Sequence, residues 1–288
     1  MARIRQRRGR GKETVEEPVD GGLARLVPDL YRAGSWELLI DGAPQSHVDL
    51  ADPAHLVFEY QRRLGHFADL AQPPGRPMSV VHLGGGALSL VRYIAVTRPR
   101  SEQQVAEPDA RLTALVRREL PLPRAARVRI RPSDAREMLR KIPEGWADLV
   151  IADVFDRART PAHVTSAEFL DEVRRALRPG GSYAANVADG PPFGYLRGQL
   201  ATAVSRFAEV VLTAEPAVLR GRRYGNGVLW ASDRALPLVD LGHRCAADPS
   251  PARVLAGREL TDFVAGAAVV GDATAVASPP PPPGTFGD

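Results

Sequence analysis

From Met78 to Ser232 the sequence alternates between short apolar runs and longer amphipathic stretches, and this alternation constrains the fold more than any other feature. Five apolar runs of strand length are each followed by a stretch with helical periodicity. This pattern predicts an α/β protein with an open, mostly parallel sheet and helices on both faces. Two final runs follow each other without a helix, which indicates an antiparallel edge. The expected strands are 78–84, 102–108, 126–132, 147–155, 182–188, 209–215 and 226–232.

The segments outside this alternation predict smaller regions at both ends. Runs 35–41 and 45–50 flank a Gly-Ala-Pro turn and predict a β-hairpin, and Asp52 followed by Pro53 predicts a helix start. A last short helix is expected over 257–270. We therefore divide the chain into a disordered basic arm (1–22), a hairpin and helix (23–75), a nucleoside-binding domain (76–235), a C-terminal extension (236–272) and a disordered, Pro-rich polyproline II tail (273–288).

Composition excludes several classes of protein. Cys245 is the only cysteine, so one chain can form neither a disulfide framework nor a thiolate zinc site, and the histidines lack metal-ligand spacing. We therefore expect no metal. No apolar stretch has the length of a membrane span or of a secretory signal, so we expect a cytoplasmic protein.

The charge balance argues against a nucleic-acid-binding domain. The net charge is +4, but the first twelve residues carry six basic side chains, which leaves 32 basic against 34 acidic residues in the rest. Any contact with nucleic acid is therefore expected through the basic arm alone.

Polar groups follow three successive strands of the expected sheet. Gly84, Gly85 and Gly86 end the first strand, where glycine lets backbone N–H groups face a ligand. Glu107 ends the second strand and can accept both hydroxyls of a ribose. Asp134 follows the third strand and can hold an adenine amino group. Each acid can instead cap the helix that follows it, but together they favour a nucleoside site.

Two further acids follow the fourth strand. Asp153 directly succeeds the apolar run "ADLVIA" and should be enclosed, whereas Asp156 lies just beyond it in a loop. Two carboxylates that face one cavity suit a cationic amine, since one can take a proton from the attacking nitrogen and the other can anchor a distant ammonium. Asp156 can also be a solvated loop acid.

Several segments, in this order and spacing, resemble the spermidine synthase (polyamine aminopropyltransferase) family, a branch of the class I S-adenosylmethionine-dependent methyltransferase-like, Rossmann-like fold. The resemblance covers residues 35 to 232. It rests on "LLIDGAPQS", "YQRRLGHFADL", "HLGGGAL", "VAEPD", "SDAREML" and "DVFDRARTPAHVTSAEF".

The resemblance implies a transfer reaction and a role for each residue. Decarboxylated S-adenosylmethionine would donate an aminopropyl group to an amine such as putrescine, with no tightly bound cofactor. Asp153 would be the base, Asp156 an amine anchor, and Gln45, Tyr60 and Gln61 substrate-facing residues. The three glycines, Glu107 and Asp134 would hold the adenosine. A homodimer or homotetramer, joined through the N-terminal hairpin, is also implied.

The chain departs from the family pattern at the donor and acceptor ends. Ala87 replaces the aspartate that binds the donor's ammonium in the family, and Tyr224 aligns poorly with the family's late tyrosine. Arg62, Arg157 and Arg159 are expected to bring positive charge to the mouth of the site. Three hypotheses follow: an aminopropyltransferase, a methyltransferase-like enzyme that uses intact S-adenosylmethionine, and a non-catalytic nucleoside-binding homologue.

Overall fold

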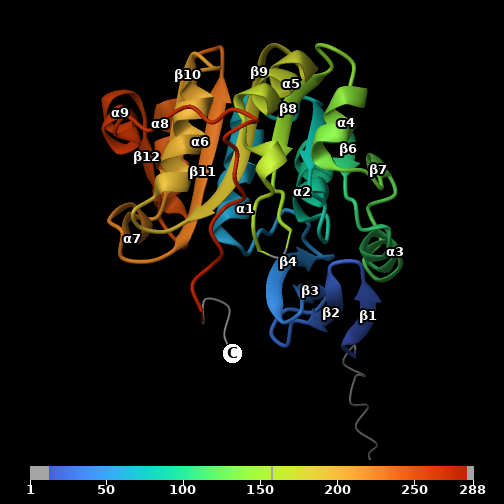
Figure 1. Ribbon diagram of the computed structural model, residues 1–288. Helices are drawn as coiled ribbons and strands as arrows, with labels where there is room; N and C mark the ends of the chain where they lie inside the picture. Colours follow the sequence, from blue (N-terminus) through green and yellow to red (C-terminus); the bar gives the residue numbers. More distant parts are fainter. Residues whose placement is uncertain (1–12, 157, 284–288) are drawn as a thin grey trace, which may run out of the picture.

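The computed structural model describes residues 13–156 and 158–283. It consists of a small antiparallel sheet and a larger sheet covered by helices (Figure 1). The strand order of the larger sheet is β12-β10-β11-β9-β8-β5-β6-β7. Its strands are β5 (Ser79–Leu83), β6 (Glu102–Ala106), β7 (Arg127–Arg131), β8 (Ala147–Ala152), β9 (Leu177–Asp189), β10 (Glu209–Ala214), β11 (Gly225–Ser232) and β12 (Arg253–Leu255).

The expected open, mostly parallel sheet is confirmed. Strands β5 to β9 pair in parallel, and β9, β11, β10 and β12 pair antiparallel at one edge. The chain runs from β5 outward through β6 to β7, then returns to β8 on the other side of β5. Strand order therefore reverses between β5 and β8, where open α/β sheets form their ligand crevice.

Helices bury apolar side chains against both faces of the larger sheet. On one face Met138, Phe169 and Leu196 share a core with the strands. On the other face Phe67 stacks on Trp230 of β11, with ring centroids 5.0 Å apart. The helices are α1 (Glu59–Ala71), α2 (Ser89–Thr97), α3 (Ala110–Glu119), α4 (Ala135–Lys141), α5 (Ala167–Ala176), α6 (Gly194–Val204), α7 (Pro216–Leu219), α8 (Leu238–Ala247), α9 (Gly257–Val264) and the short 3₁₀ helix η1 (Ala162–Val164).

The small sheet holds four strands, β1 (Val15–Val19), β2 (Gly22–Pro28), β3 (Ser35–Ile40) and β4 (Ala43–Asp49). The hairpin expected over 35–50 is present as β3 and β4. The expectation of a disordered arm is wrong for residues 15–19, because pairing with β2 supplies the hydrogen bonds of β1. Residues 1–12 lie outside the described residues.

The start expected for the first helix is also wrong. Helix α1 begins at Glu59, after Phe58, and the Asp52 carboxylate instead lies 3.3 Å from Arg32 Nη2. Both Asp52 and Asp49 pair with this arginine, so a tertiary contact competes with the local cap.

The C-terminal extension contains more structure than expected. Helix α8 and strand β12 were not predicted, and α9 ends at Val264 rather than at residue 270. The expectation of a disordered tail is wrong for Ser278, which is fully buried. Residues 284–288 lie outside the described residues. Within 13–156 and 158–283, no helix combines the length and apolar character needed to span a bilayer.

Candidate active site

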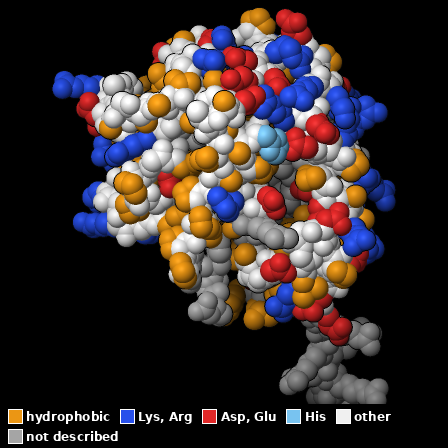
Figure 2. Space-filling view, in the orientation of Figure 1, with side chains coloured by type: hydrophobic (Ala, Val, Ile, Leu, Met, Phe, Trp, Pro, Cys, Tyr) orange, Lys and Arg blue, Asp and Glu red, His pale blue; other side chains and the backbone are white. Residues whose placement is uncertain are grey.

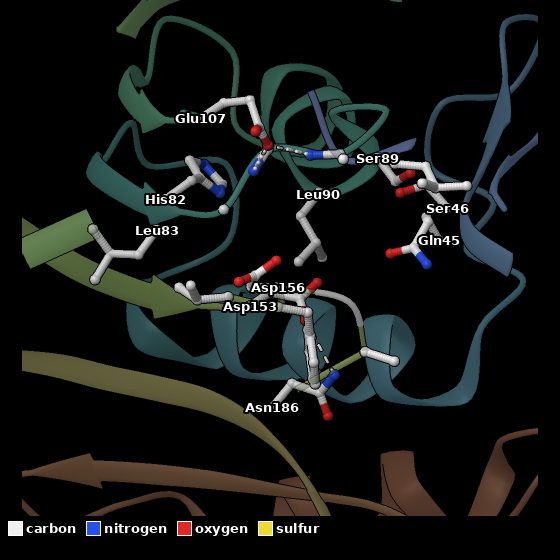
Figure 3. A pocket seen from close by; sticks show the side chains of 18 of the residues that line it. Gln45, Ser46, His82, Leu83, Ser89, Leu90, Glu107, Asp153, Asp156 and Asn186 are labelled. Atoms are coloured by element: carbon white, nitrogen blue, oxygen red, sulfur yellow. Dashed lines mark hydrogen bonds between the residues drawn. The ribbon is translucent and has the colours of Figure 1, made fainter. Parts of the chain in front are cut away.

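A cavity of about 640 Å³ lies at the carboxyl ends of β5, β6 and β8, against the small sheet. Figure 3 shows Asp153 and Asp156 near its centre, with Gln45 and Ser46 of β4 on one side and Glu107 on another. Its position coincides with the reversal of strand order. Residues far apart in sequence therefore meet around one space.

The glycines after β5 are needed for close packing. Gly84 has φ +93°, and a Cβ there would lie 2.1 Å from the Asp153 carbonyl oxygen. Gly86 has φ +48°, and a Cβ there would lie 2.7 Å from Ser46 Oγ. The backbones of two strand ends thus approach each other at Gly84, and the small sheet touches the loop at Gly86.

Glu107 ties the glycine loop to the end of β6. Its Oε2 accepts hydrogen bonds from the N–H groups of Gly85 (3.0 Å) and Gly86 (3.1 Å), and its Oε1 accepts one from Asp109 N–H (3.0 Å). Burial raises the pKa of Glu107, although these three donors oppose the shift. Asp109, rather than Glu107, caps α3 by accepting from Leu112 N–H.

Asp134 caps α4 and also lines the cavity. One carboxylate oxygen accepts from the N–H groups of Arg136 (2.8 Å) and Glu137 (3.2 Å), and the other lies 2.7 Å from His163 Nε2. Burial alone raises the pKa of Asp134, but the bonds from His163 and the helix N–H groups outweigh it and lower the pKa. The helix-cap interpretation of Asp134 is therefore correct, and it is compatible with a place in the cavity wall.

Asp153 stands at the end of β8 within a cluster of polar side chains. Its Oδ1 accepts a hydrogen bond from Asn186 Nδ2 (3.0 Å), and the Tyr60 hydroxyl also bonds to its carboxylate. Burial raises the pKa of Asp153 to about 6 despite both bonds. Gln61 Nε2 lies 3.3 Å from the Tyr60 hydroxyl, which lies 3.5 Å from the carbonyl oxygen of Gln45. The fold thus brings four residues singled out in the sequence to one place.

Asp156 lies in the loop beyond β8 and is exposed. Its backbone forms a two-way bridge with Arg159, with N–H to O distances of 2.8 and 3.0 Å. The residue lines the same cavity as Asp153. Both carboxylates therefore border one space, as expected for a site that takes a cation.

The charge of the cavity wall is strongly negative. Figure 2 shows acidic side chains around the middle of the visible face, over the junction of the two sheets. His82 is uncharged at neutral pH, because burial lowers its pKa to about 4. Among the described residues the charged wall consists of one arginine, Arg223, and six acids: Asp20, Glu107, Asp109, Asp134, Asp153 and Asp156.

The expectation that three arginines bring positive charge to the entrance of the cavity is wrong for two of them. Arg62 donates to the carbonyl oxygens of Leu56 (3.1 Å) and Val57, and Arg159 Nε donates to Ser278 O (2.6 Å). Neither arginine lines the cavity. Arg157 lies outside the described residues.

Ala87 faces the protein interior. It is 1% exposed and packs in the core between the small sheet, α2 and α3, while its N–H donates to Ser46 Oγ (3.2 Å). It contributes no wall to the cavity. The alanine at this position therefore leaves no gap in the wall of the cavity.

The structure adds wall residues that the motifs did not identify. Asn186 was missed, although an amide within the apolar run "SYAANVA" is a polar signal at a strand's carboxyl end. Asn226 donates to Glu59 (2.9 Å), and Tyr224 lines the same end of the cavity. In the part of the chain that is described, no three His, Cys, Asp or Glu side chains are grouped to hold a metal ion.

Comparison with known proteins agrees with this arrangement. Residues 57–217 match the family model of the spermine/spermidine synthase domain. A curated polyamine aminopropyltransferase of Chromobacterium violaceum is 29% identical over 143 residues, which are 49% of this chain and 53% of that protein. The match thus spans about half the length of that relative.

Solved structures extend the similarity over most of the chain. The crystal structure of a probable spermidine synthase from Corynebacterium glutamicum superposes with a TM-score of 0.84 and 32% identity, covering 91% of this chain and 97% of that one. Human methyltransferase-like protein 13, in complex with SAH, has a TM-score of 0.51 and 17% identity over 73% of this chain and 90% of that one, and shares the fold alone. With a matching family model and a similar structure along nearly its full length, the chain belongs to the spermine/spermidine synthase family.

Proposed function

We propose that the protein is an aminopropyltransferase that uses decarboxylated S-adenosylmethionine as donor and an amine such as putrescine as acceptor. The observation that carries the proposal is the Asp153 carboxylate, which faces a cavity whose wall, among the described residues, holds six acids and one arginine. Such a wall attracts cations and repels anions. Donor and acceptor are both cationic, and both fit this electrostatic environment.

The donor's adenosine would lie over the glycine loop. Glu107 has one acceptor site left for a ribose hydroxyl, on Oε1, because its two oxygens offer about four lone-pair sites and the backbone donates three hydrogen bonds. Asp134 borders the adenine end. This placement directs the sulfonium toward Asp153, which follows the neighbouring strand. Ala87 lies in the core and has no carboxylate to pair with the donor's ammonium. The acids of the cavity wall would balance this charge instead.

Asp153 would act as the general base. The amine nitrogen attacks the methylene carbon beside the sulfonium, the new C–N bond forms as the C–S bond breaks, and methylthioadenosine leaves. The nitrogen's proton passes to the Asp153 carboxylate. A pKa of about 6 keeps this carboxylate ionised at neutral pH and makes it a stronger base than an ordinary aspartate. Tyr60 and Asn186 hold it in place.

A methyltransferase-like reaction is the second candidate. It is favoured by Ala87, because the loop has no carboxylate to select a decarboxylated donor. Arg223 of the wall offers a partner for the carboxylate of intact S-adenosylmethionine. The two candidates differ in their donor and in the nucleoside product.

The experiment compares both donors on the same protein. Calorimetry should detect tighter binding of decarboxylated than of intact S-adenosylmethionine, and mass spectrometry should detect methylthioadenosine with diamine acceptors. Asp153→Asn should lower turnover by about 10²- to 10⁴-fold and leave binding of the uncharged methylthioadenosine intact. Asp233→Asn, at an exposed ion pair with Arg174, is the control. Methyl transfer from the intact donor, or full activity of Asp153→Asn, would contradict the proposal.

A further inference from the structure

The C-terminal segment 268–283 packs against the chain that leads from the cavity to α5. Val270 O accepts a hydrogen bond from Ala167 N–H (2.8 Å). The Asp272 carboxylate pairs with Arg136 Nη1 (2.8 Å) and also accepts from the Ser166 hydroxyl. In Figure 1 this segment is the red coil that runs down past the loop after β8. Segment 268–283 is thus fastened to the start of α5 and to Arg136.

Ser278 contacts the loop that follows Asp156. It is 0% exposed, and each of its backbone and side-chain polar groups is bonded. Its Oγ accepts from Thr160 N–H (2.8 Å), its N–H donates to Thr160 O (2.9 Å), and its O accepts from Arg159 Nε (2.6 Å). A buried serine with three bonds to two adjacent residues fixes their position strongly.

One of these two residues, Arg159, in turn contacts Asp156. Arg159 forms the two-way backbone bridge with Asp156, at 2.8 and 3.0 Å. Asp156 makes this bridge with its main chain, so its carboxylate is left to face the cavity. A continuous set of hydrogen bonds therefore runs from Ser278 through Arg159 and Thr160 to an acid of the wall.

We propose that Ser278 is a positioning residue that sets the place of Asp156 for the acceptor amine. The proposal rests on the proposed function for the role of Asp156 as amine anchor. A pre-positioned carboxylate binds a flexible diamine without first being ordered, so its effect should be seen in acceptor binding. Asp153 and the adenosine end are held by hydrogen bonds from other elements and should be unaffected.

The test uses the full-length chain with Ser278→Ala, which removes the hydroxyl and keeps the backbone bonds. We expect the acceptor KM to rise about 5- to 10-fold, while kcat and the Kd of methylthioadenosine stay within twofold. Val276→Ala is the matched control, because Val276 lies on the same segment and is 65% exposed. In an Asp156→Asn background Ser278→Ala should have no further effect on the acceptor KM, since Ser278 is expected to affect the acceptor only through Asp156.

Hydrogen exchange of the free protein provides a readout that needs no substrate. Ser278→Ala should speed amide exchange at Arg159 and Thr160 and leave the exchange of β5 and β8 unchanged. Unchanged exchange at these two residues would overturn the inference whatever the reaction is. Faster exchange with an unchanged acceptor KM, or an equal rise in the KM of donor and acceptor, would also overturn it. If diamines are not substrates, the proposed function fails, and exchange at Arg159 and Thr160 still decides whether Ser278 holds this loop.

Discussion

At the scale of single residues, the raised pKa of Asp153 is linked to a loss of stability. Its carboxylate is largely withdrawn from water at the end of β8, and two hydrogen bonds replace only part of the lost hydration. The resulting pKa of about 6 lies well above the ordinary aspartate value of 3.8. If Asp153 is the base, as proposed, its pKa suits neutral pH at a cost to the stability of the folded state, a compromise expected at active sites.

Asp153→Asn should stabilise the protein at pH 7.5 and not at pH 4. The unfolded state ionises this carboxyl near 3.8 and the folded state near 6, so stability is lost as pH rises between these values. An asparagine does not ionise, so the free energy of unfolding at pH 7.5 should rise by about 2–3 kcal/mol in the variant. Urea unfolding at both pH values measures it. An equal gain at both would show that the effect does not come from ionisation.

At the scale of elements, the turn from β5 into α2 depends on Gly84. Its φ of +93° suits glycine, and a Cβ would collide with the Asp153 carbonyl oxygen at 2.1 Å. Since that carbonyl belongs to the adjacent strand end, a clash there cannot be relieved by turning a side chain. The glycine therefore maintains the spacing between the two strand ends that border the cavity.

Gly84→Ala should destabilise the fold by more than strain alone. The matched control is Gly42→Ala, because Gly42 has a similar φ of +82° and a Cβ added there would meet no atom within 4 Å. The free energy of unfolding of the control should fall by about 1–2 kcal/mol, because alanine is strained at a positive φ. The free energy of unfolding of Gly84→Ala should fall by at least about 2 kcal/mol more, because the added methyl group collides with backbone atoms. Denaturant unfolding of both variants tests this, and equal losses would mean that the close approach is unimportant.

Features that depend on residues close together in sequence could be predicted, whereas those that depend on distant residues could not. The parallel strands of the larger sheet were predicted because strand and helix periodicities are local. Strand β1 was missed because its hydrogen bonds come from β2, and Asp52 was misread because Arg32 competes for it. In the site, the acids at strand ends could be named from motifs, whereas the contact of Ser278 with Thr160 depends on residues 118 apart.

At the scale of the whole molecule, one apolar cluster joins the two sheets. Leu26 and Leu38 of the small sheet pack with Ala87, Val91 and Leu115 of the larger domain. The cavity lies beside this junction, so its wall takes Gln45 and Ser46 from one sheet and its acids mainly from the other. The small sheet is therefore part of the site, and the negative wall acts on any ligand that enters between the two sheets.

The acidic wall should make acceptor capture depend on salt while nucleoside binding does not. Attraction between a dication and six wall carboxylates is long-range, and it weakens as the Debye length shortens from about 30 Å at 0.01 M to about 8 Å at 0.15 M salt. The diamine kcat/KM should fall several-fold over this range. Methylthioadenosine carries no charge, so its Kd from calorimetry should change less than twofold and serves as the control. A kcat/KM independent of salt would mean that the wall charges do not draw the acceptor in, whereas a parallel change in both constants would point to an effect of salt on the fold.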